Sequence, residues 1–221
     1  MSAAERAGEP RRPAPRLIVI TDTALAPEPI LLERLERALA AAQPDTVMVQ
    51  LRDRELGARA RLALGRRLVT LCRRHAQWFA VNDRLDLAVL LGADGVHLGE
   101  GGVEVADARV LLGASAWISC ARHAPGGVAI PGADAVLLSP IAAPRKGNPA
   151  LGIPALQSAH AALASTAPRD RPLLYALGGI DASNAAACLS HGADGVAVIG
   201  AILDGRDPAG LLDALGILRR R

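Results

Sequence analysis

The segment WFAVNDRLDLAVLLGADGVHLG, residues 78–99, contains two short apolar runs separated by a Leu-rich stretch and a Gly-Ala-Asp turn sequence. The runs, residues 78–81 and 95–98, lack the polar alternation of a half-exposed strand. Continuous apolar runs are typical of parallel strands buried on both faces. Two such strands with a helix-like segment between them form the repeating unit of parallel α/β folds.

The same rhythm extends along the chain in both directions from this segment. We expect eight strands, at residues 17–21, 46–51, 78–81, 95–98, 116–119, 135–138, 173–176 and 195–199. We expect helices between them, including residues 30–42, 58–75, 183–190 and 208–218, the last two after caps at Asp181 and Asp207. Eight alternations favour a closed barrel over an open sheet. The sequence therefore predicts one (β/α)₈ TIM barrel over residues 16–221, after a disordered tail at residues 1–15.

A Gly-Ala-Asp motif occurs three times, beginning at Gly92, Gly132 and Gly192, and each copy leads into a predicted strand. We interpret the glycine as the end of a helix and the aspartate as a turn residue. This places the motif at the amino ends of the strands, the end of the barrel that serves stability.

Composition restricts the class of protein. Hydrophobic residues make up 51% of the 221 residues and aromatic residues only 2%, which argues against a base-stacking nucleic-acid module. The net charge is +3, with much of the basic excess at the two ends of the chain, so no nucleic-acid partner is expected. Three cysteines without CxxC spacing predict neither a zinc site nor a disulfide framework. The sequence contains no signal-like or membrane-spanning apolar run, which predicts a cytoplasmic protein without a membrane partner.

The residues that follow the predicted strands suit phosphorylated ligands, because reacting groups of such barrels lie at the carboxyl ends of the strands. Gly178-Gly179 follows the seventh strand, and Ile199-Gly200 ends the eighth, where these barrels commonly bind phosphate. Four cations, Arg52, Arg54, Arg145 and Lys146, converge on the same face and suit a polyanion. A tight turn and a solvated charge run are the alternative interpretations.

Other polar residues at these ends have open roles. Asn82-Asp83 suits a magnesium ion that bridges substrate phosphates, although Asp83 could instead cap the next helix. His97 and His123 could act as general acids or bases, or could simply be packed and hydrogen-bonded. Cys120 has no paired base in the sequence and is interpreted as a packed thiol.

Several segments resemble the thiamine phosphate synthase family and its close relative, the thiazole tautomerase. They are Ile20-Thr21-Asp22, Gln50-Leu51-Arg52, residues 82–88, residues 92–99, residues 176–180 and residues 195–198. The resemblance covers about residues 16–215, and NDRLDLAVLLGADGVHLG is its most specific part. It implies a transferase of thiamine biosynthesis that joins a hydroxymethylpyrimidine pyrophosphate to a thiazole phosphate, releases pyrophosphate and uses Mg²⁺.

The resemblance also implies roles for individual residues. Arg52 and Lys146 would be catalytic, because they would stabilise the departing pyrophosphate. Asp83 would bind Mg²⁺, with Glu100 as the second metal ligand. The implied substrate-binding residues are Gln50, Arg52, Arg54, Asn82, Ser119, Arg145, Lys146, Gly178, Gly179, Ile199 and Gly200.

Some positions depart from the family pattern. Arg54 stands where the family has Lys, and Gly102 stands near the expected second metal carboxylate, so Glu100 or Glu104 would have to substitute. Ala121 aligns with the family's strand-five Ser, and the Thr-Pro-Thr-Lys loop appears as Ala143-Pro144-Arg145-Lys146.

Pro140 occupies the place of the tautomerase base. Three hypotheses therefore remain: a synthase, a tautomerase-like isomerase, or a non-catalytic barrel that binds a phosphorylated ligand. A homo-oligomer is possible under each of them.

Overall fold

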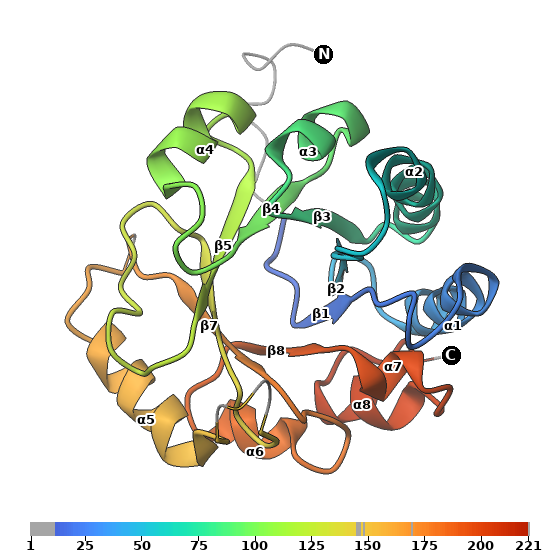
Figure 1. The fold of residues 1–221 in the computed structure, drawn as a ribbon. Coiled ribbons are helices and arrows are strands. Elements are labelled where there is room, and N and C mark those ends of the chain that lie inside the picture. Colours follow the sequence, from blue (N-terminus) through green and yellow to red (C-terminus); the bar gives the residue numbers. More distant parts are fainter. Residues whose placement is uncertain (1–11, 145–146, 148, 169, 221) are drawn as a thin grey trace.

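The structure, a computed structural model, describes residues 12–144, 147, 149–168 and 170–220. Eight parallel strands close into one barrel, each paired with its neighbours in the chain, and β8 pairs with β1. Figure 1 shows the helices around this ring. The strands are β1 (Leu17–Ile20), β2 (Val47–Leu51), β3 (Trp78–Asn82), β4 (Gly95–Leu98), β5 (Trp117–Arg122), β6 (Ala135–Leu138), β7 (Leu173–Leu177) and β8 (Gly195–Val198). The predicted (β/α)₈ barrel is confirmed.

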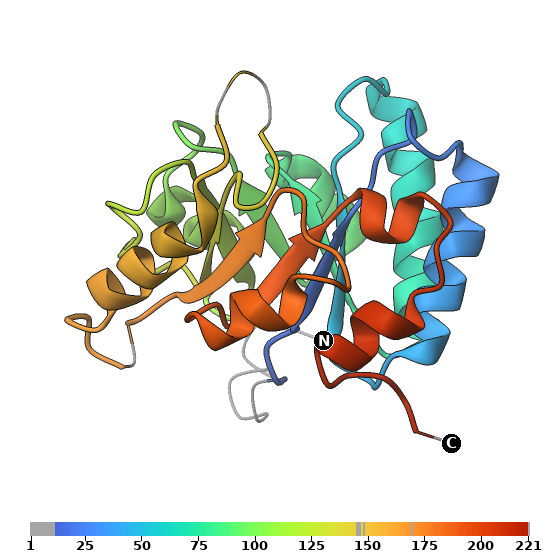
Figure 2. The same cartoon turned by 90° about the horizontal axis from the view of Figure 1, so that it is seen from below.

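Helices follow every strand except β5. They are α1 (Glu28–Ala41), α2 (Ala58–Arg74), α3 (Leu85–Leu91), α4 (Val105–Leu112), α5 (Gly152–Leu163), α6 (Ala185–Ser190), α7 (Gly200–Leu203) and α8 (Ala209–Ala214). Figure 2 shows α1 and α2 side by side along one wall of the barrel. Residues 123–134, all of which the structure describes, contain no helix, so the expected alternation is wrong after β5. Three glycines and two prolines in this connection disfavour a helix there.

The two predicted helix caps are also wrong. Asn184 is the N-cap residue of α6 and Pro208 that of α8. Asp181 and Asp207 instead accept hydrogen bonds from the backbone N–H groups two residues further on, at 2.8 and 3.1 Å. This short-range bond is an Asx turn.

The barrel interior is apolar at its amino end and polar at its carboxyl end. One cluster of buried side chains fills the interior toward the amino end: Ile18, Ile20, Met48, Trp78, Ala80, Trp117, Ala135, Leu137, Tyr175 and Ala197. Side chains alternate between the two faces of a strand, so the residues two positions further along β2, β3 and β5 also point inward. Those residues are Gln50, Asn82 and Ser119, all buried. The sequence therefore places a polar layer directly beneath the mouth of the barrel.

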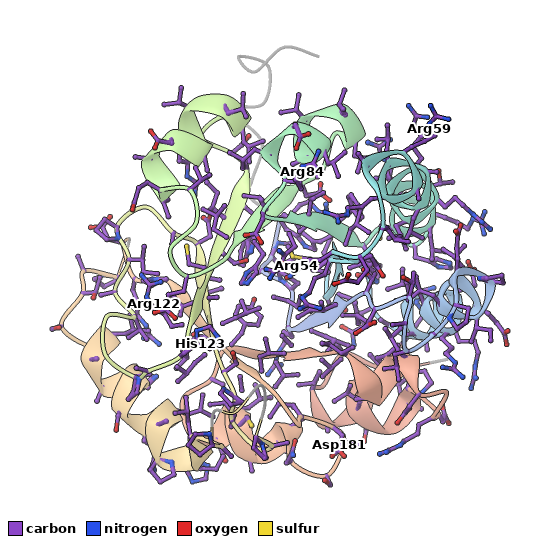
Figure 3. All side chains as sticks on the ribbon, viewed as in Figure 1. Arg54, Arg59, Arg84, Arg122, His123 and Asp181 are labelled. Carbon is purple, nitrogen blue, oxygen red and sulfur yellow. The ribbon has the colours of Figure 1, made fainter. Side chains whose placement is uncertain are left out.

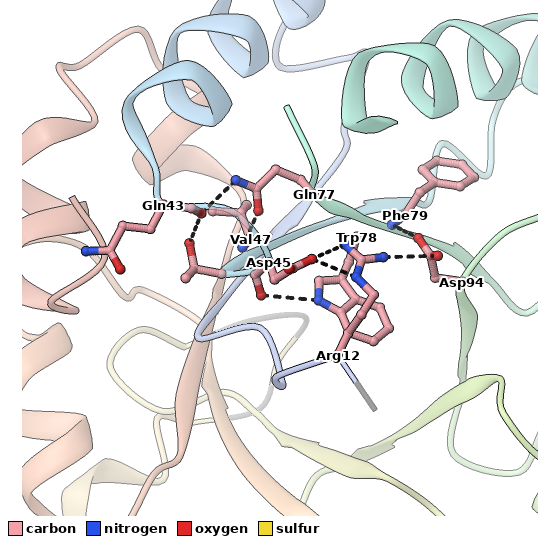
Figure 4. Close-up of polar contacts among 9 residues, drawn as sticks. Arg12, Gln43, Asp45, Val47, Gln77, Trp78, Phe79 and Asp94 are labelled. Atoms are coloured by element: carbon pink, nitrogen blue, oxygen red, sulfur yellow. Dashed lines mark hydrogen bonds and ion pairs between the residues drawn. The ribbon is translucent and has the colours of Figure 1, made fainter. Parts of the chain in front are cut away.

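Arg12 lies at the amino end of the barrel, beside Asp45, Trp78 and Asp94 (Figure 4). Arg12 forms ion pairs with Asp45 at 2.6 Å and Asp94 at 3.3 Å, and its guanidinium carbon lies 4.2 Å from the centre of the Trp78 ring. The Tyr175 hydroxyl donates a hydrogen bond to the carbonyl oxygen of Pro15. Arg12 and Pro15, which were expected to belong to a disordered tail, thus make specific contacts with the barrel, and residues 1–11 lie outside the described part of the chain.

The Gly-Ala-Asp motifs join neighbouring strands at this end. The carboxylates of Asp94, Asp134 and Asp194 each accept a 2.8 Å hydrogen bond from the backbone N–H of the second residue of the preceding strand. Gly92 ends α3 in the left-handed region with φ 56°, as predicted. Gly132 lies in the connection between β5 and β6, which contains no helix, so the helix-end interpretation is wrong for that copy. All three motifs lie at the amino ends of the strands, as expected.

No helix in the described residues is both long and apolar enough to cross a membrane.

Candidate active site

Gly178, Gly179, Ile199 and Gly200 line one cavity of about 270 Å³ at the carboxyl ends of β7 and β8. The first two glycines have φ angles of 101° and 72°, which favour glycine. A Cβ atom at Gly179 would lie 2.6 Å from the Cβ of Ala143, and one at Gly178 would lie 2.9 Å from the Cα of Pro140. The structure thus brings together the four residues at the strand ends where phosphate binding is expected.

Three charged residues at this cavity were missed in the sequence. Asp181, Asp204 and Arg206 also line it. Arg206 forms ion pairs with Asp204 at 2.7 Å and with Asp181 at 3.6 Å, and its side chain is 68% exposed. Arg206 lies between α7 and α8, away from the strand ends, so attention to strand ends alone could not find it. Its guanidinium group offsets two carboxylates that would otherwise repel an anion.

A chain of hydrogen bonds connects two predicted substrate-binding residues, Gln50 and Asn82, to the predicted metal ligand Asp83. The Gln50 side-chain amide donates to Asn82 Oδ1 at 3.1 Å, and the Asn82 amide donates to Asp83 Oδ2 at 2.6 Å. Gln50 Oε1 is buried and has no hydrogen-bond partner among the described residues. A buried acceptor without a partner is costly, so a ligand that donates a hydrogen bond would satisfy it.

Asp83 is the centre of this network. Its backbone is left-handed with φ 60°, and its carboxylate also accepts from the Gly99 N–H at 2.7 Å and from Arg54 Nη2 at 2.8 Å. Figure 3 shows Arg54 near the middle of the ring of strands, whereas Arg59 of α2 lies at its periphery. The carboxylate expected to bind metal is thus paired with an arginine expected to bind pyrophosphate.

The residues do not fit a resident magnesium site. Glu100 pairs with His123 Nδ1 at 2.5 Å, and the alternative ligand, Glu104, is exposed immediately before α4. Among the described residues, no three His, Cys, Asp or Glu side chains form a group that could hold a metal ion. Asp83 is the one carboxylate of the inner network, and its oxygens already have three hydrogen-bond donors.

His97 lies inside the polar layer. Its Nδ1 lies 3.0 Å from Ser119 Oγ. Burial lowers the pKa of His97 to about 4, so the imidazole is neutral at pH 7. Ser119 is therefore hydrogen-bonded to His97 inside the barrel. Ala121, two residues further along β5, occupies the next inward position, nearer the mouth of the barrel. The histidine is a packed, hydrogen-bonded group and not a cationic acid.

The remaining predicted residues have different environments. The Arg52 backbone N–H donates to Thr21 Oγ1 at 2.9 Å. Cys120 is buried, and burial raises the pKa of its thiol to about 11, as expected for a packed cysteine. Arg145 and Lys146 lie outside the described residues.

The closed barrel and the polar residues at the carboxyl ends of its strands define the (β/α)₈-barrel class, whose members carry their active sites at this end. The model of the TMP-TENI family, described as thiamine monophosphate synthase, matches residues 17–202. The chain belongs to this family.

Individual relatives agree with this assignment. The chain is 39% identical over 203 residues to a thiamine-phosphate synthase of Gloeobacter violaceus, covering 90% of this chain but 55% of that relative's length. It is 40% identical over 182 residues to a thiamine-phosphate synthase of Thermus thermophilus, covering 80% of this chain and 83% of the relative. The solved thiamine phosphate pyrophosphorylase of Pyrococcus furiosus superposes with a TM-score of 0.77 at 26% identity, over 91% of this chain and 95% of that one.

Proposed function

We propose that this chain is a thiamine-phosphate synthase, a transferase that joins a hydroxymethylpyrimidine pyrophosphate to a thiazole phosphate. The observation that supports the proposal is the presence, on one barrel face, of two different groups of residues that each suit an anion. The first, called the glycine half below, is the cavity of Gly178, Gly179, Ile199 and Gly200. The second, called the side-chain half, comprises Gln50, Arg52, Arg54, Asn82 and Asp83. A reaction between two phosphorylated substrates needs both.

In the proposed reaction, the bond between the pyrimidine methylene carbon and the pyrophosphate oxygen breaks, and its electron pair leaves with pyrophosphate. The lone pair of the thiazole nitrogen then forms the new carbon–nitrogen bond, and no proton is transferred. Arg52, Arg54 and Lys146 would stabilise the charge on departing pyrophosphate. The amides of Gln50 and Asn82 would orient the pyrimidine, and the unpaired Gln50 oxygen supports this role because it can accept a hydrogen bond from the ring's amino group.

Binding of the pyrophosphate group would require Arg54 to change partners. In the structure its guanidinium group is paired with Asp83, and both side chains are partly exposed, at 50% and 38%. An ion pair this exposed contributes little stability, so exchange to a pyrophosphate oxygen is feasible. Because the described residues do not fit a resident Mg²⁺, we assign no step to the metal.

The assay combines purified protein with both phosphorylated precursors, with and without Mg²⁺, and measures thiamine phosphate and pyrophosphate. We expect equal amounts of the two products. Tight binding of thiazole phosphate without product would instead indicate a non-catalytic barrel, and an isomerised thiazole would indicate the tautomerase. Pro140 supplies no side-chain base for the latter. Such an enzyme would act on small phosphorylated molecules in the cytoplasm.

A further inference from the structure

Thr21 and Asp53 form a buried polar pair beneath the loops that follow β1 and β2. Thr21 is 0% exposed and Asp53 is 5% exposed. The Thr21 hydroxyl donates a hydrogen bond to Asp53 Oδ2, and Asp53 Oδ1 accepts from the Thr23 N–H at 2.6 Å. Both loops are therefore joined through one buried carboxylate.

The hydrogen bonds run in one fixed direction. The Arg52 backbone N–H can only donate, so the Thr21 hydroxyl oxygen accepts that 2.9 Å bond. The hydroxyl then has one hydrogen left to donate, and Asp53 Oδ2 accepts it. The Thr21 hydroxyl thus contacts the loop after β2 at two points, the Arg52 N–H and the Asp53 carboxylate. An apolar side chain of the same shape could make neither hydrogen bond.

The same loop is held from its other side by α2. Arg61, which is buried, donates through Nη2 to the carbonyl oxygens of Arg54 at 2.6 Å and Leu56 at 3.0 Å. The backbone is therefore fixed at Arg52 and again at Arg54, the two residues whose side chains carry the charge of this half. A preorganised cation stabilises developing negative charge better than a mobile one.

We propose that Thr21 and Asp53 are positioning residues for the transfer reaction. They hold the backbone of Arg52 so that the side chains of Arg52 and Arg54 are directed at the departing pyrophosphate. Neither residue touches substrate; both act through the loop. This inference rests on the proposed function, because pyrophosphate is the anion that the loop would receive.

The test uses a matched pair of variants, Thr21→Val and Thr21→Ser. Valine keeps the branched shape and removes the hydroxyl, whereas serine keeps the hydroxyl. Inorganic pyrophosphate and the thiazole phosphate are titrated separately by calorimetry, and thermal unfolding is recorded for each variant. We expect Thr21→Val to weaken pyrophosphate binding about tenfold, equivalent to about 1.4 kcal/mol. Thr21→Ser should remain within about twofold of the original protein, and the affinity for thiazole phosphate should not change in either variant.

Asp53→Asn provides the second variant, and it carries the test if Thr21→Val does not fold. It keeps the size of the side chain and removes its charge, and we expect the same selective loss of pyrophosphate affinity. Equal weakening of both ligands would show a general structural role and overturn the proposal. A lower melting temperature with unchanged pyrophosphate affinity would overturn it as well.

The proposed function can fail separately. If the original protein binds pyrophosphate but forms no thiamine phosphate, and Thr21→Val still weakens pyrophosphate alone, the synthase proposal falls while the positioning role stands. If the original protein binds no pyrophosphate, both proposals fall. If thiamine phosphate forms, we also expect Thr21→Val to raise the KM for the pyrimidine pyrophosphate and to leave that for thiazole phosphate unchanged.

Discussion

The two halves of the barrel mouth are built from different parts of the chain. The glycine half is formed largely by backbone, and its shape depends on positive φ angles at Gly178 and Gly179. In the side-chain half, Gln50 bonds to Asn82, and Arg54 pairs with Asp83. On the proposed function, the glycine half would receive its ligand without breaking the hydrogen bonds of the side-chain half, whereas the side-chain half would have to give up the Arg54–Asp83 pair. Substitutions should therefore affect one substrate at a time.

Replacing Arg52 should produce the largest difference between the effects on the two substrates. Arg52→Ala removes a cation proposed to stabilise the leaving pyrophosphate, and losing one such group typically costs about 10²- to 10³-fold. We expect kcat/KM for the pyrimidine substrate to fall by that factor, with the KM for thiazole phosphate unchanged. Steady-state kinetics with each substrate varied in turn measures both. Arg52→Lys, which keeps charge without the planar fork, should recover part of the loss. Equal losses of kcat/KM for both substrates would contradict the assignment of the two halves to different substrates.

Replacing Asp83 should have the next largest effect. Asn tolerates the left-handed backbone at this position but replaces one of the two carboxylate oxygens that accept from the Asn82 amide and the Gly99 N–H, so Asn82 would lose its fixed orientation. We expect Asp83→Asn to lower kcat/KM for the pyrimidine substrate by about 10- to 100-fold. The assay is repeated over a range of Mg²⁺ concentrations. We expect no recovery at high Mg²⁺; recovery would show that Asp83 binds the metal.

Gly200→Ala should affect the opposite half. A Cβ atom at Gly200 meets no atom within 4 Å, so the variant should fold normally and place a methyl group at the cavity lining. We expect the KM for thiazole phosphate to rise about tenfold, a change of about 1.4 kcal/mol. Gly126→Ala is the matched control, because its Cβ atom also meets nothing and it lies in the β5–β6 connection. A change in the pyrimidine KM would argue against separate halves.

His97 should affect stability rather than affinity. Its pKa is about 4 in the folded protein and 6.5 in the unfolded chain, because burial disfavours the charged imidazole. Between these values the unfolded state binds more protons, so the contribution of His97 is full above pH 6.5 and is lost as the pH falls toward 4. At pH 5 the loss is roughly 2 kcal/mol. Unfolding at pH 7 and pH 5 should show a smaller pH dependence in His97→Gln; an equal dependence would contradict this assignment.

Much of the fold was predictable from the sequence because strand positions depend on local patterns. The apolar runs located all eight strands, and the Gly-rich ends of β7 and β8 located the cavity. The helix after β5 was wrongly expected because the alternation was extended across Pro125 and the two following glycines. In this connection the proline and glycine residues are a stronger signal against a helix than the strand–helix alternation is for one.

The site was less predictable because its contacts join residues far apart in the chain. Arg54 and Asp83 both follow strands, yet nothing in their sequence spacing reveals that they pair with each other. The register that brings Thr21 beside Asp53 is equally invisible in a single sequence. Arg12 was assigned to a tail because it lies among prolines and charges, whereas its partners Asp45 and Asp94 lie at the starts of distant strands.

The three Gly-Ala-Asp carboxylates have a consequence for how such a barrel is assembled. Asp94 binds the start of β3, Asp134 the start of β5 and Asp194 the start of β7, so each carboxylate joins one odd-numbered strand to the even-numbered strand that follows it. The unit that repeats is therefore a pair of strands, not a single one. A circular permutant with new ends between β4 and β5 would keep all three units whole, whereas a cut between β3 and β4 would divide one.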